Sequence, residues 1–220
     1  DGKKFVEEAL LRINYNCNQR CLFCWVETGF ENPAHETVTE NIERLEDYET
    51  GTVCITGGEP TLNPRLPEYI SMLTRDNIGK VCLQTNGVLL HKKEFADQLA
   101  SAGLDFAFVS LHSHDPRISD MLTGAAGSFD KTVRGVMNLR DRGVSVLLSH
   151  VMNTFNFRAL PGFVRFVHRR LANTPIAFLC AAPIYGAMIH RGLIPRFTDL
   201  KNPLLAALEM CYEYDVPFAG

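Results

Sequence analysis

The segment Asn16-Cys17-Asn18-Gln19-Arg20-Cys21-Leu22-Phe23-Cys24-Trp25 determines how the rest of this 220-residue chain is interpreted. Its three cysteines are spaced C-x3-C-x2-C, and no fourth cysteine follows at a matching spacing. Iron–sulfur clusters are usually held by four thiolates. Three thiolates on a cubane cluster leave one iron open to water or substrate, which parallels the open position of catalytic metal sites. The spacing therefore predicts a cluster with one open iron, held by Cys17, Cys21 and Cys24.

Two other uses of these cysteines are less favoured. Structural zinc requires a fourth Cys or His in a second pair of ligands. The nearest downstream histidine, His35, lies beyond a Gly-Phe-Glu-Asn-Pro turn and fits no such pattern. A disulfide framework is weaker still, because three is an odd number and the chain shows no secretory features.

The second informative segment is Gly57-Gly58-Glu59-Pro60, at the end of the next predicted strand. The two glycines allow a positive φ and a close approach of the backbone to a ligand, and Glu59 adds a carboxylate that can bind an ammonium group. The plain alternative is a Gly-Gly turn with a solvated Glu59. Together with Phe23 directly before the third cysteine, the two segments resemble the signature of the radical S-adenosylmethionine (SAM) superfamily, and the resemblance covers nearly the whole chain.

The resemblance implies a mechanism. Cys17, Cys21 and Cys24 would hold a [4Fe-4S] cluster, and the amino and carboxylate groups of SAM would chelate its fourth iron. One electron, from a reductant such as flavodoxin or ferredoxin, would cleave SAM to methionine and a 5′-deoxyadenosyl radical, which abstracts hydrogen from a substrate in the barrel. In such enzymes the cofactor carries the difficult chemistry, while the protein supplies orientation and excludes water.

The resemblance also implies contacts with SAM. In the family, the motif at Gly57, Gly58 and Glu59 holds the amino group of SAM, and the position of Phe23 lies near the adenine. Polar residues at later strand ends are expected to contact the cofactor: Thr85, Asn86, Ser110 and Asn153. Each of these has a plainer role as a cap or turn former. Cys180 matches the place of a hydrogen-atom donor in radical SAM epimerases, although packing is the more common role of such a thiol.

Strand and helix patterns alternate six times along the chain. The strands are near-continuously apolar, as expected when both faces of a sheet are covered, and right-handed crossovers then build a parallel sheet. The predicted fold class is α/β, a partial (β/α)6 TIM-like barrel forming a single domain over residues 1–220. The predicted strands are 10–15, 52–56, 80–85, 106–111, 144–151 and 176–180, and the predicted helices are 35–49, 64–76, 92–102, 129–141, 158–171 and 204–214.

In a parallel barrel the active site lies at the carboxyl ends of the strands. Polar or glycine-rich segments follow all six predicted strands, at 16–25, 57–60, 84–87, 110–114, 149–153 and 182–186. His112, His114 and His150 fall in these segments and are expected to be polar rim residues, with acid–base chemistry or a second metal site as the less favoured roles. Trp25 is expected either to shield the cluster or to pack in the core.

The remaining cysteines are assigned by their place in the predicted elements. Cys54 and Cys82 lie within strands and are predicted to be core thiols, since free cysteine is commonly buried. Cys211 lies in the last helix, either as a lone buried thiol or as the first ligand of a further cluster. Many relatives append a Cys-rich domain after this point, so a C-terminal extension beyond residue 220 is a further expectation.

Composition excludes several function classes. The net charge of −3 argues against a nucleic-acid surface. No run of eighteen apolar residues predicts a membrane span, and no signal peptide is visible. Seven cysteines without a paired framework indicate a reducing compartment, so the protein is expected to be cytoplasmic.

The substrate does not follow from the sequence. The spacing of Ser110-Leu111-His112 and the Gly127-Ser128-Phe129 helix start look like peptide-maturing relatives, so the first expectation is a peptide or modified amino acid. The runner-up is a small molecule of cofactor or natural-product biosynthesis. Two non-enzymes are further alternatives, an iron–sulfur electron carrier and a zinc-stapled binding module, and neither requires Gly57-Gly58-Glu59 in register.

Overall fold

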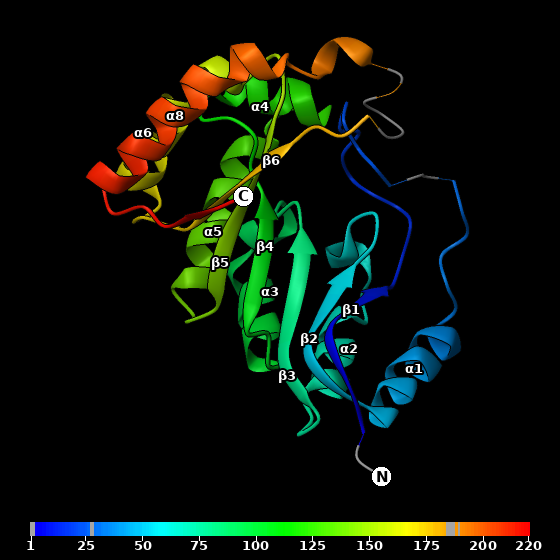
Figure 1. Ribbon diagram of the computed structural model, residues 1–220. Coiled ribbons are helices and arrows are strands. Elements are labelled where there is room, and N and C mark those ends of the chain that lie inside the picture. Colours follow the sequence, from blue (N-terminus) through cyan, green and yellow to red (C-terminus); the bar gives the residue numbers. More distant parts are fainter. Residues whose placement is uncertain (1–2, 27–28, 184–187, 189) are drawn as a thin grey trace.

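A parallel sheet organises the molecule. The computed structural model describes residues 3–26, 29–183, 188 and 190–220. Within them, seven parallel strands lie in sequence order and curl into an open half-barrel, with helices along its outer side (Figure 1). The strands are β1 (Lys4–Arg12), β2 (Tyr48–Thr56), β3 (Ile78–Thr85), β4 (Phe106–Ser110), β5 (Ser145–Met152), β6 (Ile176–Cys180) and β7 (Phe218–Ala219). The predicted α/β partial barrel is confirmed.

Helices connect the successive strands. The α-helices are α1 (His35–Glu43), α2 (Leu66–Leu73), α3 (Lys93–Ser101), α4 (Pro116–Thr123), α5 (Ser128–Arg140), α6 (Leu160–Arg170) and α8 (Phe197–Glu213). Short 3-10 helices are η1 (Arg44–Asp47), η2 (Pro60–Leu62), η3 (Leu89–His91), η4 (Phe157–Ala159) and η5 (Arg191–Leu193). In the described residues, no helix combines the length and the apolar character needed to cross a membrane.

Successive side chains of each strand point to opposite faces of the sheet, and the two faces differ in burial. On the face that packs against the helices, one residue from each of β2 to β6 is fully buried: Ile55, Leu83, Val109, Leu148 and Ile176. The opposite, concave face is less covered, because Leu10 is 62% exposed and Leu179 is 37% exposed. The main core therefore lies between sheet and helices, and the concave side is left open for a site.

Three elements differ from the sequence expectations. The first strand is shifted, to Lys4–Arg12 from the predicted 10–15, and residues 13–16 belong to the following loop. The first helix ends at Glu43, before the predicted 49, because Tyr48 and Glu49 pair with Lys4 and Phe5 as the start of β2. Sheet pairing overrides the helical periodicity of this segment. The last helix begins at Phe197, earlier than the predicted 204.

Two elements were not expected. The strand β7 has only two residues, too few for any periodicity, yet it pairs in parallel with β6. Helix α4 begins with an Asp115 cap, whose carboxylate accepts from the Arg117 backbone N–H at 2.9 Å, and ends at the left-handed Gly124 (φ 62°). These are standard start and stop signals of a helix. Helix α4 matters for the site, as described below.

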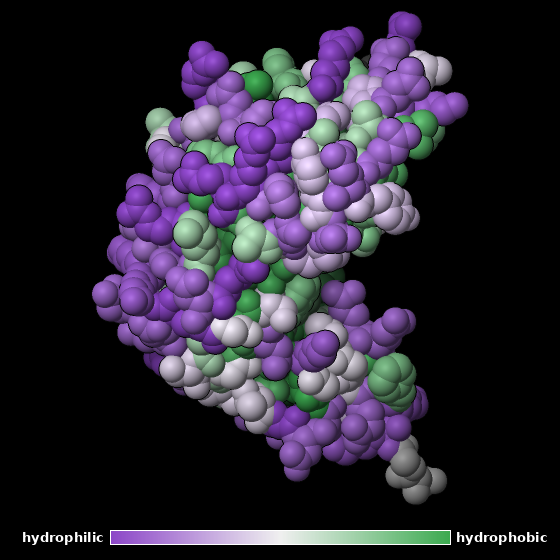
Figure 2. All heavy atoms as spheres, turned by 90° about the vertical axis from the view of Figure 1, so that its left-hand side faces the viewer, coloured by the Kyte–Doolittle hydropathy of each residue, from purple (hydrophilic) through white to green (hydrophobic). Residues whose placement is uncertain are grey.

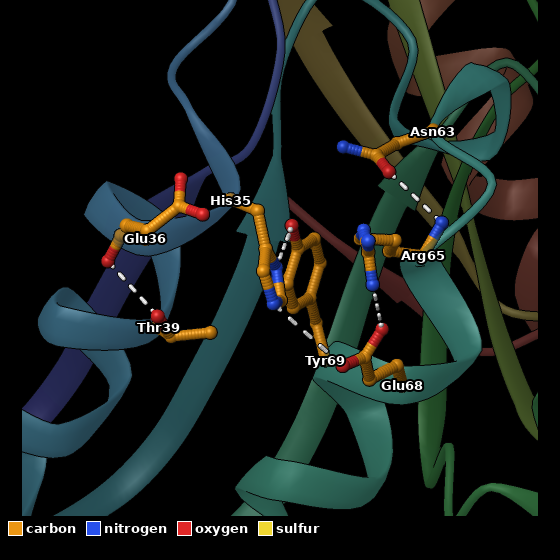
Figure 3. A network of polar contacts seen from close by, with 7 residues as sticks. All are labelled: His35, Glu36, Thr39, Asn63, Arg65, Glu68 and Tyr69. Atoms are coloured by element: carbon orange, nitrogen blue, oxygen red, sulfur yellow. Dashed lines mark hydrogen bonds and ion pairs between the residues drawn. The ribbon is translucent and has the colours of Figure 1, made fainter.

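His35, the histidine tested against a zinc pattern, lies at the contact between α1 and α2 (Figure 3). Its ring stacks on Tyr69 with a centroid distance of 5.7 Å, and its Nδ1 lies 3.1 Å from the Tyr69 hydroxyl. Its Nε2 is 3.9 Å from a carboxylate oxygen of Glu68, which also accepts from Arg65. His35 therefore has a structural role in joining these helices.

Candidate active site

A cavity of about 300 Å³ opens at the carboxyl ends of the strands. Its lining includes nearly all residues that the sequence singled out: Cys17, Cys21, Phe23, Cys24, Gly57, Gly58, Glu59, Thr85, Asn86, Ser110 and Cys180. Figure 2 shows the molecule hollowed on the side toward which the concave face of the sheet opens. The strand ends thus bring together segments that are far apart in the sequence.

The cysteine loop, residues 13–26, carries the three motif thiols to this cavity. Helix α4 anchors it: the backbone N–H groups of Arg20 and Leu22 donate to the carbonyls of Thr123 (2.8 Å) and Leu122 (3.0 Å). Gly124 is needed here, because a Cβ at this position would lie 3.0 Å from the Arg20 carbonyl oxygen. Sequence reasoning missed this anchor, since nothing in the pattern of α4 signals a partner in the cysteine loop.

The donor set fits an iron–sulfur cluster. Three thiols on one loop line a common cavity, as the separate irons of a cluster require. Among the described residues, no three His, Cys, Asp or Glu side chains are grouped around a single metal ion. Burial raises the pKa of the Cys21 thiol to about 12, and burial also raises the pKa of Cys17. Burial therefore disfavours the thiolate form of these cysteines. Coordination to iron would offset this effect, because a metal deprotonates a coordinating thiol.

Gly57 and Gly58 serve the packing of the cysteine loop. A Cβ on Gly57 would lie 2.8 Å from the Asn14 carbonyl oxygen, and a Cβ on Gly58 would lie 2.7 Å from the Asn16 carbonyl carbon. The backbone N–H groups of Gly58 and Glu59 donate to the carbonyls of Asn14 (3.0 Å) and Asn16 (2.8 Å). Neither glycine has a positive φ, so that expectation was wrong. Here the closely approaching group is the chain's own backbone.

Glu59 is almost completely buried, which corrects the alternative of a solvated carboxylate. Its Oε1 accepts from the Thr61 backbone N–H (3.1 Å) and from the hydroxyls of Thr61 and Thr85 (both 2.6 Å). Its Oε2 accepts from the Asn86 backbone N–H at 2.7 Å. Burial is the largest influence on its pKa and raises it, while these donors oppose the rise. Glu59 therefore joins the ends of β2 and β3, and Oε2 has a single hydrogen-bond donor among the described residues.

Asn86 connects β3 to the cysteine loop. Its side-chain Nδ2 donates to Asn18 Oδ1 at 2.7 Å and lies 3.9 Å from the sulfur of Cys17. Its Oδ1 accepts from the Val88 N–H at 3.0 Å, and its carbonyl accepts from the Thr132 hydroxyl at 2.8 Å. Every polar group of this residue is thus engaged with the protein. Its predicted contact with SAM stays a prediction, and holding the cysteine loop is an additional role that the sequence did not reveal.

Of the three histidines expected at the rim, His112 lines the cavity, whereas His150 and His114 are not among the lining residues. His112 and His150 are buried, and burial lowers the pKa of each to about 3. His112 lines the cavity, whereas His150 packs on the helix side of the sheet against Phe163, with ring centroids 4.1 Å apart. His114 is partly buried, with its Nδ1 sealed in the interior. The sequence did not reveal the burial of these histidines, because a side chain near a strand end can lie on either face of the sheet.

Of the remaining candidates, three line the cavity and one does not. Ser110 and Cys180 line the cavity, and Cys180 is exposed there. Trp25 also lines it and is 50% exposed, so the core-packing alternative was wrong. Asn153 is fully buried and outside the described lining. Its amide donates to the Val151 carbonyl (3.1 Å) and accepts from the Phe155 N–H (3.0 Å), as a turn former does.

Three other cysteines lie away from the cavity lining. Cys54 and Cys82 are buried on the paired strands β2 and β3, as expected, and their sulfurs are 3.1 Å apart. Cys211 is buried in α8. Of the segment 182–186 predicted to follow the sixth strand, residues 184–186 lie outside the described part of the chain.

Comparison with known proteins gives three findings. A family model described as "Radical SAM superfamily" matches residues 11–167. The chain is 35% identical over 167 residues to a probable GTP 3′,8-cyclase of Sulfolobus acidocaldarius, covering 73% of this chain and 52% of that protein. It is 30% identical over 149 residues to Fe-coproporphyrin III synthase of Methanosarcina barkeri, covering 66% and 37%. The chain thus spans about half or less of the length of these relatives.

Among solved structures, SuiB of Streptococcus suis bound to S-adenosylmethionine has the same fold. The TM-score is 0.79 at 19% identity, covering 98% of this chain and 50% of SuiB. The family uses a [4Fe-4S] cluster and SAM, and the relatives named above are enzymes. The match over 11–167 contains all three motif cysteines and the segment Gly57–Glu59. On this basis the chain belongs to the radical SAM superfamily.

Proposed function

We propose that Cys17, Cys21 and Cys24 hold the [4Fe-4S] cluster and that SAM binds beside it in the cavity at the strand ends. The observation that carries this proposal is that the three thiols and the segment Gly57–Glu59 line one cavity. When bound and reduced, the cluster would supply the electron for reductive cleavage of SAM, and the radical so generated would abstract hydrogen from the substrate.

The chain's own residues orient the reactants and exclude water. We propose that the amino group of SAM donates to Oε2 of Glu59, since Glu59 lines the cavity and this oxygen has one donor, the Asn86 N–H, among the described residues. Ser110 presents a hydroxyl to the same cavity. Phe23 and Trp25 add apolar surface near the thiols. We propose that Cys180, which is exposed and lines the cavity, returns a hydrogen atom to a substrate radical, and that a flavodoxin or ferredoxin donates the electron.

For the substrate we propose a small molecule of the kind handled in cofactor biosynthesis. The support is that the relative at 35% identity is named a probable GTP 3′,8-cyclase and the relative at 30% identity an Fe-coproporphyrin III synthase. The peptide expectation rested partly on Gly127-Ser128-Phe129. In the structure this segment starts α5, and Asp120 accepts from the Ser128 hydroxyl (3.1 Å) and the Phe129 N–H (2.9 Å). It has a structural role and favours no substrate class.

The experiment is anaerobic reconstitution with iron and sulfide, addition of dithionite and SAM, and chromatographic measurement of 5′-deoxyadenosine. We expect slow formation by the wild type and none by Cys21→Ser, with Cys211→Ser as the matched control that keeps activity because Cys211 lies in α8, outside the cavity lining. GTP and iron-coproporphyrin precursors are then tested for acceleration. No deoxyadenosine from a fully loaded cluster would favour the electron carrier.

A further inference from the structure

His112 occupies an unusual place in the cavity wall. It follows β4, is only 3% exposed, and lines the cavity. Its ring meets the ring of Phe23 edge-on, with centroids 4.7 Å apart. Its carbonyl accepts from the Asn156 amide at 2.8 Å. The ring is thus packed against Phe23, the backbone of His112 is held by Asn156, and the side chain borders whatever fills the cavity.

The tautomer of this ring follows from its backbone partner. The Val151 N–H, from β5, donates to His112 Nδ1 at 3.1 Å. A ring nitrogen that accepts carries no proton, so the neutral ring carries its proton on Nε2. Burial lowers the pKa of His112 to about 3, so the ring is neutral throughout the physiological range. The ring therefore offers a permanent N–H donor.

The Nε2 atom keeps access to the cavity. It has no hydrogen bond within the described residues. The described side-chain atoms that are fully buried without a partner are four others: Asn14 Oδ1, Thr50 Oγ1, His114 Nδ1 and His150 Nε2. A donor at a cavity wall without a protein acceptor costs free energy unless a ligand or water accepts from it. The cavity thus contains a place for an acceptor atom beside His112.

The acceptor next to His112 is identified by the cavity that His112 shares with the three motif cysteines. Phe23, whose ring contacts that of His112, directly precedes Cys24 and lines the same cavity. The molecule nearest the cluster is SAM, whose oxygens are good acceptors. We infer that His112 is a SAM-positioning residue whose Nε2–H donates to an oxygen of bound SAM, an inference that rests on the proposed function.

Two conservative variants separate this role from a structural one. His112→Asn keeps an acceptor near the place of Nδ1 for the Val151 N–H and removes the Nε2 donor. His112→Gln places an amide donor near Nε2 and leaves the Val151 N–H without its acceptor. If His112 donates to SAM, glutamine should restore SAM binding and asparagine should not. If His112 serves only to accept from the Val151 N–H, asparagine should restore SAM binding and glutamine should not. The two explanations predict opposite orders of the variants.

The test is anaerobic calorimetric titration of SAM into the reconstituted holoenzyme. We expect the Kd for SAM to be about three- to tenfold higher in His112→Asn than in the wild type, because one hydrogen bond is lost. The Kd of His112→Gln should stay within about twofold of the wild-type value. The midpoint of urea unfolding should be lower for His112→Gln than for His112→Asn, which shows that each variant changed the intended edge.

Three results would overturn the inference. Unchanged SAM affinity in both variants, or weaker affinity only in His112→Gln, contradicts the donor role while the proposed function stands. A wild-type holoenzyme with a full cluster that binds no SAM contradicts the proposed function itself, and the inference fails with it.

Discussion

Replacing Gly58 with alanine is expected to push the cysteine loop away from the end of β2. The new Cβ would lie 2.7 Å from the Asn16 carbonyl carbon and closer still to the carbonyl oxygens of Tyr15 and Asn16. All three atoms belong to the backbone, so no side-chain rotation relieves the overlap. The chain must separate at this point, where Gly58 and Glu59 donate to the carbonyls of Asn14 and Asn16.

The magnitude follows from these contacts. Two backbone hydrogen bonds contribute about 0.5–1.5 kcal/mol each, and overpacking a closely packed site costs about 1–3 kcal/mol. The free energy of unfolding should therefore fall by about 2–6 kcal/mol. For a chain of this length, each kcal/mol lowers Tm by about 2–4 °C, so a loss of about 3 kcal/mol corresponds to a Tm lower by roughly 6–12 °C.

The assay is urea and thermal unfolding of Gly58→Ala beside a matched glycine variant. Gly192→Ala is the control, because a Cβ there meets nothing within 4 Å and its φ is not left-handed. We expect the control to stay within about 0.5 kcal/mol of the wild type, as exposed substitutions do. Gly58→Ala should also bind less iron on reconstitution. Equal stability of the two variants would refute the close-packing argument.

Three further predictions concern other parts of the site. Asn86→Ala should lower the iron content after reconstitution, because it removes the amide that reaches the loop of Cys17; an iron count equal to the wild type would argue against this. Glu59→Gln should cost about 1–3 kcal/mol in urea unfolding, since an amide leaves one of the donors around it unpaired; no loss would contradict the network. Acidification from about pH 7.5 to about pH 5.5 should cost about 1–1.5 kcal/mol for each of His112 and His150, because their pKa is about 3 when folded and about 6.5 when unfolded, so the unfolded chain binds more protons. His112→Asn should remove the His112 share of this pH dependence, with the shares of His150, His114 and Glu59 cancelling in the comparison with the wild type; an unaltered slope would exclude the assignment.

Much of the fold could be predicted because the strands are strong local signals. The runs ending at Thr56, Thr85 and Cys180 are apolar or β-branched and are followed by glycine, asparagine or proline segments, and their ends agree with the structure. What failed depends on partners distant in sequence. Tyr48 and Glu49 continue a helical period but pair with β1, and Phe218–Ala219 is a strand only because β6 lies beside it.

The site was predictable in its location and less so in its roles. The cysteine spacing and the segment Gly57–Glu59 identify the cavity, since binding a cluster requires thiols and both segments follow predicted strands. The reason for the two glycines is a contact with Asn14 and Asn16, which no pattern of spacing encodes. The state of His112 likewise depends on which face it occupies and on the Val151 N–H, and both are set by sheet register.

The most direct test of the account is electron paramagnetic resonance of the anaerobically reconstituted, dithionite-reduced protein with and without SAM. Because the open iron is proposed to be the place where SAM coordinates, the signal of the reduced cluster should change shape and g values when SAM is added, in the wild type and in Cys180→Ala alike. A loaded, reduced cluster whose spectrum is identical with and without SAM would contradict the central claim that Cys17, Cys21 and Cys24 hold a cluster with an iron open to SAM.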